Sequence, residues 1–414
     1  MLNVKRNQLA LDILGGFSVV LLALDTYGFL PSFLYLTERV SIPPRYFAFL
    51  LLLSTLSFLA FKWRESCKNN IWKPAIIWFM SAFLLVLVYY LLGKFGYLYL
   101  VNECATAFFH GLIIIMCTVI LLNTGGDRLF FLLCQVMKIL FLIACLTIIY
   151  DYYFPGDFVS QKSEFSNFGR GAGYYVNANG AGTAIICGWV FIFLLYKSNE
   201  KYFYFLTAMG FYALLLTFSR SAWLALAFSL FMALLFRIVK PRKFVNITII
   251  AMLCFILFKS ILYFYFLADD HRQAYQWMEA HAVRINFSEN SLLDHSALDR
   301  VACMKAAIDA INISPIFGNG IGSVQYLFDK SPHNSYLELW ADYGILGLLL
   351  NCSLIVILFL MFYRKNNDAG EFCFFTGSIV LVAGIFSHAL ISNGPLLLLI
   401  AISFSNFSFG FVRR

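Results

Sequence analysis

The chain has 414 residues, of which 61% are hydrophobic and 13% are charged, whereas soluble domains average roughly 45–50% and about 25%. Its mean hydropathy is +0.79 and 18% of its residues are aromatic. A soluble domain cannot bury that much apolar surface, which argues against a cytosolic enzyme, a secreted disulfide scaffold and a disordered regulator. The net charge of +8 is what basic residues near the ends of membrane spans produce, so it does not point to nucleic acid.

Twelve apolar segments predict membrane-spanning helices, because a helix that crosses the hydrocarbon core needs about 20 apolar residues. The predicted spans are 9–30, 46–61, 74–92, 106–122, 129–150, 178–196, 202–218, 221–239, 244–266, 336–363, 372–390 and 395–411. The first apolar run lacks a small-residue cleavage site, so we expect a retained first helix rather than a removed signal peptide. The prediction is an all-α, polytopic integral membrane protein, with residues 1–414 forming a single membrane domain.

The distribution of basic residues predicts the orientation of these spans. An even number of spans puts both termini on one side, and the termini and connections of that side hold seventeen Lys and Arg residues. The short connections of the other side hold six. Because basic residues are retained in cytoplasmic loops, we expect cytoplasmic termini and two longer segments, 151–177 and 267–332, on the outer face.

Asp12 and Asp25 fall within the first predicted span. Acids inside a membrane often mark a proton path, but either residue can instead lie near a bilayer face or bond within the bundle. The ten cysteines form no C-x-x-C motif or Cys/His cluster, which argues against a zinc site and a disulfide framework. Asp269 and Asp270 are adjacent and point in opposite directions in an extended loop, so we expect no metal and no cofactor.

The outer segment 151–177 is rich in Gly, Tyr and Asn and contains Arg170 in the sequence Phe168-Gly-Arg-Gly-Ala-Gly173. Glycines on both sides of an arginine allow the backbone to approach a ligand closely. Arg170 is therefore a candidate phosphate contact, although glycine-rich loops are common.

Arg220 lies in Thr217-Phe-Ser-Arg-Ser-Ala-Trp223, which predicts a very tight outer turn before the eighth span. The start of that helix adds a partial positive charge, and a guanidinium group can hold phosphate oxygens through two hydrogen bonds. Arg220 is therefore a candidate ligand for a phosphate at headgroup depth. The alternative is an interfacial arginine that reaches ordinary lipid phosphates.

The segment 267–332 is the largest polar stretch and predicts a large periplasmic loop between the ninth and tenth spans. Ser296 and Asp299 have the spacing of a capping box. The helix that they begin carries Leu298, Val301, Ile308 and Ile311 at near-helical spacing. It ends at Ser314-Pro315 and is followed by a flexible turn, Gly318-Asn-Gly-Ile-Gly322. This pattern predicts a short amphipathic helix lying on the outer leaflet.

Arg300 lies in the first turn of this loop helix, where the helix dipole disfavours a positive charge. A helix that tolerates this arrangement is suited to presenting the charge to an anion. The alternative is a solvated surface arginine that pairs with Asp299 or Asp294.

His333 precedes the tenth span, where Ser335 and Glu338 have the spacing of a second capping box. The helix dipole and nearby arginines are expected to lower the pKa of His333 and keep the imidazole neutral. A neutral imidazole can accept a proton from a hydroxyl group, as a general base does. The alternative is an interfacial histidine bonded to Asn334 or to a backbone carbonyl.

Three stretches follow one another along the chain. They are Thr217-Phe-Ser-Arg-Ser-Ala-Trp223, then Arg300 followed by Ser314-Pro-Ile-Phe-Gly-Asn-Gly-Ile-Gly322, and then His333-Asn-Ser-Tyr-Leu-Glu-Leu-Trp-Ala-Asp-Tyr-Gly-Ile-Leu-Gly347. In this order they resemble the bacterial O-antigen ligase and polymerase superfamily. The resemblance covers residues 167–347, and the segment beginning at His333 is its most specific part. The first five spans resemble the family only in hydropathy.

The resemblance implies an inverting glycosyltransferase that uses glycans linked to undecaprenyl diphosphate at the periplasmic face of the bacterial inner membrane. In that family an Arg of the Ser-Arg turn and an Arg of the large loop are thought to hold the diphosphate. A His near the following span serves the acceptor hydroxyl. The matching positions are Arg220, Arg300 and His333, so these are the expected catalytic residues.

We therefore expect an O-antigen ligase that transfers the glycan to the lipid A–core oligosaccharide without a metal. Arg170, Asn179 and Asn334 are the expected substrate-binding residues. The family often has Pro-Asn after the outer Gly-rich loop, and this sequence departs from it with Ala178-Asn179. The expected partners are the lipid-linked glycan, the lipid A–core oligosaccharide and membrane lipids, with no nucleic acid.

Three alternatives stay open. An O-antigen polymerase extends one lipid-linked glycan with another and shares the same geometry, and a protein-glycosylating ligase belongs to the same superfamily. A lipid-linked glycan flippase or another transporter also accounts for twelve spans and a positive charge. The transporter predicts basic residues along a central cavity, whereas the ligase predicts them at the outer rim.

Overall fold

The computed structural model describes residues 2–28, 45–66, 73–92, 98–154, 170–175, 177–197, 199–268, 295–329, 332–365, 368–386, 390 and 393–405. Every regular element within these ranges is a helix, which confirms the all-α prediction. Most of the predicted large loop, residues 269–294, lies outside the described residues, and so do Asp269, Asp270 and Asp294. The same holds for the ends of several predicted spans, among them residues 406–411.

Thirteen helices are assigned in these ranges. They are α1 (Leu2–Thr26), α3 (Arg45–Ser66), α4 (Lys73–Leu92), α5 (Leu98–Tyr153), α6 (Ala178–Leu195), α7 (Glu200–Thr217), α8 (Arg220–Leu235), α9 (Pro241–Ala268), α11 (His295–Ile313), α12 (Ser323–Phe328), α13 (Ser335–Arg364), α14 (Asp368–Phe386) and α15 (Gly394–Phe404). Gly126 in α5 (φ 60°) and Gly344 in α13 (φ 65°) have non-helical dihedral angles. Each of these two helices therefore consists of two parts joined at a kink.

Length and composition identify the helices that are able to cross a membrane. Among the described residues, five helical segments qualify: Cys104–Tyr153, Ala178–Leu195, Pro241–Ile261, Ser335–Arg364 and Asp368–Phe386. Shorter apolar helices are Phe49–Ala60, Ile76–Leu92, Arg220–Leu235 and Gly394–Phe404. The chain is therefore a membrane protein. The count of twelve spans stays a prediction, and each predicted span overlaps in part with a described helix or with one half of α5.

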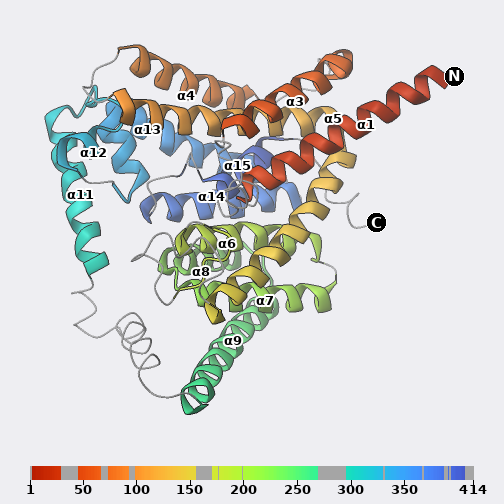
Figure 1. Ribbon diagram of the computed structural model, residues 1–414, viewed down its shortest axis with the longest axis vertical. Coiled ribbons are helices and arrows are strands. Elements are labelled where there is room, and N and C mark those ends of the chain that lie inside the picture. The colour runs from red at the N-terminus through yellow and green to blue at the C-terminus, as the bar shows by residue number, and fades with distance from the viewer. Residues whose placement is uncertain are drawn as a thin grey trace.

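The helices pack in layers that α5 connects (Figure 1). In this view α3, α4 and the first part of α5 lie at the top, α13, α14 and α15 lie in the middle, and α6, α7 and α8 lie below. After the kink at Gly126, α5 turns downward and packs against α6 and α7. α9 extends from the bottom of the bundle, while α11 and α12 lie along the left edge, opposite the start of α1.

Aromatic side chains fill the contact between α6, α7 and α14. The buried ring of Trp189 lies 5.3 Å from Phe193, 6.2 Å from Phe211 and 6.1 Å from Phe375, measured between centroids. Such ring pairs add about 0.5–1.5 kcal/mol each beyond the burial of their area. The cluster therefore fixes the relative positions of α6, which begins next to Asn179, and α7, which ends near Arg220.

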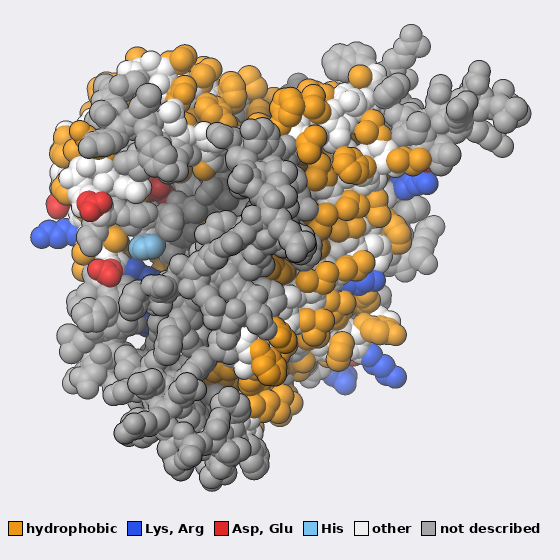
Figure 2. All heavy atoms as spheres, viewed as in Figure 1, with side chains coloured by type: hydrophobic (Ala, Val, Ile, Leu, Met, Phe, Trp, Pro, Cys, Tyr) orange, Lys and Arg blue, Asp and Glu red, His pale blue; other side chains and the backbone are white. Residues whose placement is uncertain are grey.

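Apolar side chains cover much of the described surface (Figure 2). On α9, the side chains of Met252, Leu253 and Ile256 are 61%, 58% and 56% exposed. A long helix with this much exposed apolar surface is suited to contact with lipid tails rather than with water.

Asp12 and Asp25 each have a basic partner on α5. Arg128 lies 2.6 Å from Asp12, and His110 Nε2 lies 3.3 Å from Asp25 Oδ2. The side chain of Asp25 is only 1% exposed. Asp12 and Arg128 form an ion pair between α1 and the second half of α5. Asp25 is buried beside His110 of the first half of α5, but neither its carboxylate oxygens nor His110 Nε2 makes a hydrogen bond.

The loop helix α11 exists, but it begins at His295. Ser296 therefore lies inside the first turn and is not the N-cap that the sequence predicted. The helix does end at Ile313, before Ser314-Pro315 as expected.

The apolar side chains of α11 are divided between exposed and buried positions. Val301 and Ile308 are 65% and 46% exposed, whereas Ile311 is buried. The rest of the buried face consists of small side chains, Cys303, Ala306, Ala307 and Ala310. The three alanines pack against Val324 of α12 and Ala341 of α13, because small residues let helix backbones approach closely.

Candidate active site

The side chain of Arg170 joins two of the predicted site segments. Its Nε donates a hydrogen bond to the carbonyl of Thr217 over 2.8 Å, and its Nη2 donates one to Oδ1 of Asn179, also over 2.8 Å. Thr217 is the last residue of α7 and Asn179 lies in the first turn of α6. The structure therefore brings Arg170 and Asn179 together beside the predicted arginine turn, over separations of 9 and 47 residues.

The turn that leads to Arg220 is as tight as the sequence predicted. Phe218 adopts the left-handed conformation (φ 49°), Ser219 is the extended N-cap, and Arg220 is the first residue of α8. The backbone N–H of Ser219 donates to Oγ1 of Thr217 over 3.2 Å. Arg220 is exposed, so its charge is presented outside the bundle.

The starts of α6 and α8 lie side by side. A Cβ at Gly182 of α6 would lie only 2.7 Å from the Cβ of Ser219 and 3.0 Å from that of Ala222, so this glycine permits the close approach. Asn177 caps α6 by accepting from the N–H of Gly180 over 2.7 Å. Two helix N-termini, each with a partial positive charge, thus adjoin Arg170 and Arg220. We call Arg170, Asn179 and Arg220 the arginine cluster.

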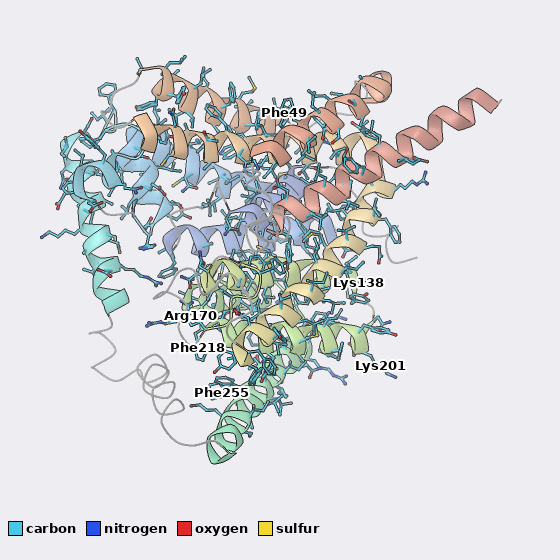
Figure 3. The ribbon with its side chains drawn as sticks, in the orientation of Figure 1. Phe49, Lys138, Arg170, Lys201, Phe218 and Phe255 are labelled. Atoms are coloured by element: carbon cyan, nitrogen blue, oxygen red, sulfur yellow. The ribbon has the colours of Figure 1, made fainter. Side chains whose placement is uncertain are left out.

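In Figure 3, Arg170 and Phe218 lie near each other at the left of the α6–α8 layer, the side on which α11 runs. Lys138 of α5 and Lys201 of α7 lie to the right of them in this view. Lys201 belongs to the connections that the sequence places in the cytoplasm. The arginine cluster therefore lies at the opposite end of α7 from a residue predicted to be cytoplasmic.

His333 and Arg300 form a second group. His333 is partly buried just before α13, and its pKa is lowered by burial and by the positive charge of Arg300, while Asp299 opposes this by raising it. The predicted direction is confirmed, but burial rather than neighbouring charge is the largest cause. Arg300 of α11 and His333 are close enough to interact electrostatically although 33 residues separate them in the sequence. The imidazole is therefore predominantly neutral near pH 7.

Asn334, rather than Ser335, is the N-cap of α13. Its Oδ1 accepts hydrogen bonds from the N–H of Tyr336 and of Leu337, over 3.0 Å and 3.1 Å. The predicted capping box of Ser335 and Glu338 is therefore wrong, because Ser335 is already the first helical residue. Asn334 orients the start of α13 and with it the neighbouring His333.

The turn 318–322 docks on the kink of α13. The backbone N–H of Asn319 donates to the carbonyl of Ala341 over 2.8 Å, and that of Gly320 donates to the carbonyl of Asp342 over 2.9 Å. Gly318 has φ 66°, and a Cβ there would clash with the backbone of Asp342 and Gly344. The turn is buried and bonded, so it is not the flexible turn that the sequence predicted.

Asp342 is a residue whose role the sequence did not reveal. Its Oδ2 accepts from the N–H of Gly322 over 2.9 Å, and its Oδ1 accepts from the N–H and the hydroxyl of Ser323 over 3.0 Å and 2.7 Å. It thereby holds the start of α12 against α13. The only indication of its importance in the sequence was its position in the motif that begins at His333, two residues before Gly344. This contact between α12 and α13 helps to hold α11, which carries Arg300, next to α13, which follows His333.

The helix α14 lies between the two groups, because it packs along both α8 and α13. The hydroxyl of Tyr336, near the start of α13, donates to the carbonyl of Leu381 in α14 over 3.0 Å. The start of α13 is thus anchored to a helix that also packs against the helix of Arg220.

Within the described part of the chain, no group of three His, Cys, Asp or Glu side chains is arranged to hold a metal ion. The cysteines whose surroundings are described are free thiols, and most of them are buried.

Residues 204–352 match the model of a protein family described as O-Antigen ligase. The match runs from α7 into α13 and contains Arg220, Arg300 and His333, while Arg170 and Asn179 lie before it. It confirms the resemblance seen in the sequence motifs. A comparison with curated proteins finds no match.

Proposed function

We propose that this chain, whose residues 204–352 carry the O-antigen ligase family domain, is a metal-independent, inverting O-antigen ligase. It transfers a glycan from undecaprenyl diphosphate to a hydroxyl of the lipid A–core oligosaccharide at the periplasmic face of the inner membrane. The observation that carries this proposal is the family match itself, which contains Arg220, Arg300 and His333. Burial and the charge of Arg300 both lower the pKa of His333. A neutral base next to a fixed positive charge suits the transfer of a group from a diphosphate to a hydroxyl.

His333 acts on the acceptor. Its neutral imidazole takes the proton of the acceptor hydroxyl while the hydroxyl oxygen forms a bond to the anomeric carbon of the donor glycan. The bond between that carbon and the diphosphate oxygen breaks, and its electron pair leaves with the undecaprenyl diphosphate. Attack from the face opposite the leaving group inverts the anomeric configuration. General-base catalysis of this kind contributes about 10²–10⁴-fold to the rate.

Arg220 and Arg300 act on the leaving group. Negative charge grows on the diphosphate as the glycosidic bond breaks, and positive groups that are already in place stabilise it without reorganisation. The adjoining starts of α6 and α8 add to the positive potential. Arg170 and Asn179 complete the donor site. Asn334 caps α13 and so fixes the start of this helix, next to His333, where the acceptor binds.

The membrane provides the remaining contribution. Both substrates carry lipid anchors, so they meet the site in one plane rather than in free solution. Holding two reactants in a productive geometry lowers the barrier by making the step effectively intramolecular.

The experiment that tests the function is a lipopolysaccharide gel of a strain that lacks the gene, complemented with the wild-type chain or with His333→Ala. The ligase predicts bare lipid A–core without O-antigen in the deletion strain, polymer stranded on the carrier lipid, and no rescue by His333→Ala. Core that carries a single repeat would identify a polymerase instead. An unglycosylated pilin with normal lipopolysaccharide would identify a protein ligase, and glycan trapped on the cytoplasmic leaflet would identify a flippase.

A further inference from the structure

We propose that Asp151 is a positioning residue that holds Arg170 in the donor site. This inference rests on the proposed function, because it concerns how the arginine cluster binds the diphosphate. Asp151 lies near the end of α5 and is 2% exposed. It lies outside both the family match and the motifs of the sequence.

The carboxylate of Asp151 binds the backbone that directly follows Arg170. Its Oδ2 accepts hydrogen bonds from the N–H of Ala172 over 2.7 Å and of Gly173 over 2.9 Å. Charge-assisted bonds of this kind are about twice as strong as neutral ones. A buried carboxylate is costly unless it is hydrogen-bonded, so these bonds both stabilise the acid and fix the turn.

The glycines around Arg170 are what allow this turn to lie on the end of α5. Gly173 has φ 59°, and a Cβ there would come within 3.0 Å of the backbone of Thr147 and Ile148. A Cβ at Gly171 would lie 2.7 Å from the carbonyl of Ile148. The N–H of Gly171 also donates to the carbonyl of Leu216 over 2.8 Å, so the turn is bound to the end of α7 as well.

Arg170 is therefore held from both ends. Its backbone is fixed through Asp151, while its guanidinium group bonds to Thr217 and Asn179. If the turn loses Asp151, the guanidinium group can no longer keep the position that the two side-chain bonds require. The effect of Asp151 on the donor is then exerted through Arg170.

The test measures glycan transfer by the purified full-length protein, with donor KM, kcat and the thermal unfolding midpoint recorded for each variant. Asp151→Ala is expected to raise the donor KM about tenfold, with kcat changed less than twofold. Asp151→Asn keeps an oxygen that can accept both bonds, and its donor KM should stay within about threefold of the wild-type value. If Asp151→Ala does not accumulate, Asp151→Glu serves instead, since its longer side chain displaces the turn.

Two comparisons separate positioning from general stability. The double variant Asp151→Ala with Arg170→Ala should have the donor KM of Arg170→Ala alone, because both changes remove the same interaction. Glu371, in the first turn of α14, forms an ion pair over 2.6 Å with Lys197, which follows α6. Both residues lie on the side of the membrane that is predicted to be cytoplasmic. Glu371→Ala should therefore lower the unfolding midpoint without changing the donor KM.

The proposal is overturned if Asp151→Ala or Asp151→Glu has the wild-type donor KM, if Asp151→Asn is as impaired as Asp151→Ala, or if the effects of Asp151→Ala and Arg170→Ala add. A different result would count against the proposed function itself. If Arg170→Ala also has the wild-type donor KM, the donor site has been assigned to the wrong residues.

Discussion

Arg170 donates a hydrogen bond to the amide oxygen of Asn179 over 2.8 Å, and this bond joins a glycine-rich turn to the first turn of α6. The same guanidinium group reaches the Thr217 carbonyl through Nε. One planar side chain thus connects α6 and α7 at the point where the chain turns towards Arg220. These two bonds depend on the planar guanidinium group, whose N–H donors point in fixed directions, unlike those of the lysine ammonium group.

Replacing Arg170 with lysine should therefore impair donor binding although the charge is kept. A single ammonium group on a flexible stem cannot hold the Thr217 carbonyl and Asn179 in the same planar arrangement. We expect a donor KM about tenfold higher in transfer assays with purified Arg170→Lys protein. Arg237→Lys, at an exposed position in the turn that follows α8, serves as the matched control. An unchanged donor KM for Arg170→Lys would show that the fork geometry is unimportant.

The pH dependence of transfer should respond to Asp299. Because Asp299 raises the pKa of His333, Asp299→Asn lowers that pKa further. The base form of His333 is lost as the pH falls through its pKa, so the acid limb of the rate profile should move to lower pH. Asp309→Asn changes an exposed acid farther along α11 and should leave the profile unchanged. A shift of the acid limb to higher pH in Asp299→Asn would contradict the assignment of that limb to His333.

Gly344→Ala should destabilise the protein more than Gly126→Ala. Both glycines have φ near +60° and ψ near −155° in a helix kink, a region that is essentially restricted to glycine and costs another residue about 1–3 kcal/mol. A Cβ at position 344 would in addition clash with the backbone of Ile316 and Gly318, whereas at position 126 it meets nothing within 4 Å. Thermal unfolding of the two variants in detergent gives the comparison. Equal midpoints would mean that the docked turn does not constrain α13.

Asp342→Ala should loosen α12 from α13 at a cost of about 2 kcal/mol or more, because three bonds to a carboxylate are lost. Ser323→Ala removes only the hydroxyl bond and should cost about 1 kcal/mol. Since this docking seats the helix of Arg300, transfer activity should fall in the same order as stability. The unfolding midpoints and rates of the two variants test this order. A larger loss in Ser323→Ala would be inconsistent with Asp342 as the main anchor.

The helices could be predicted and the main candidate site residues could be singled out because both depend on local patterns. Long apolar runs define helices whatever they pack against, and Arg220 and His333 stand next to predicted helix starts. Which residues of α11 are buried could not be predicted, since the burial of Ala306 depends on its packing with Ala341 of α13. The Asn334 cap was missed by a single residue, because Ser335 is an equally good capping type.

The roles of Asp342 and Asp151 could not be predicted from the sequence for a different reason. Each carboxylate binds backbone N–H groups about 20 residues away in the sequence, and no local spacing rule reports such a contact. Asp151 also falls just beyond the apolar run that defined its span. The sequence therefore indicated candidate residues for the chemistry, and the structure added two carboxylates that bind the backbone near some of them.

The most direct test of the central claim measures donor binding and single-turnover transfer by the purified His333→Ala protein. If His333 is the base for the acceptor, the variant should bind the undecaprenyl-diphosphate-linked glycan with an affinity within about twofold of the wild type. Its transfer to lipid A–core should be at least about 10²-fold slower. Transfer at the wild-type rate with unchanged donor binding would contradict the account.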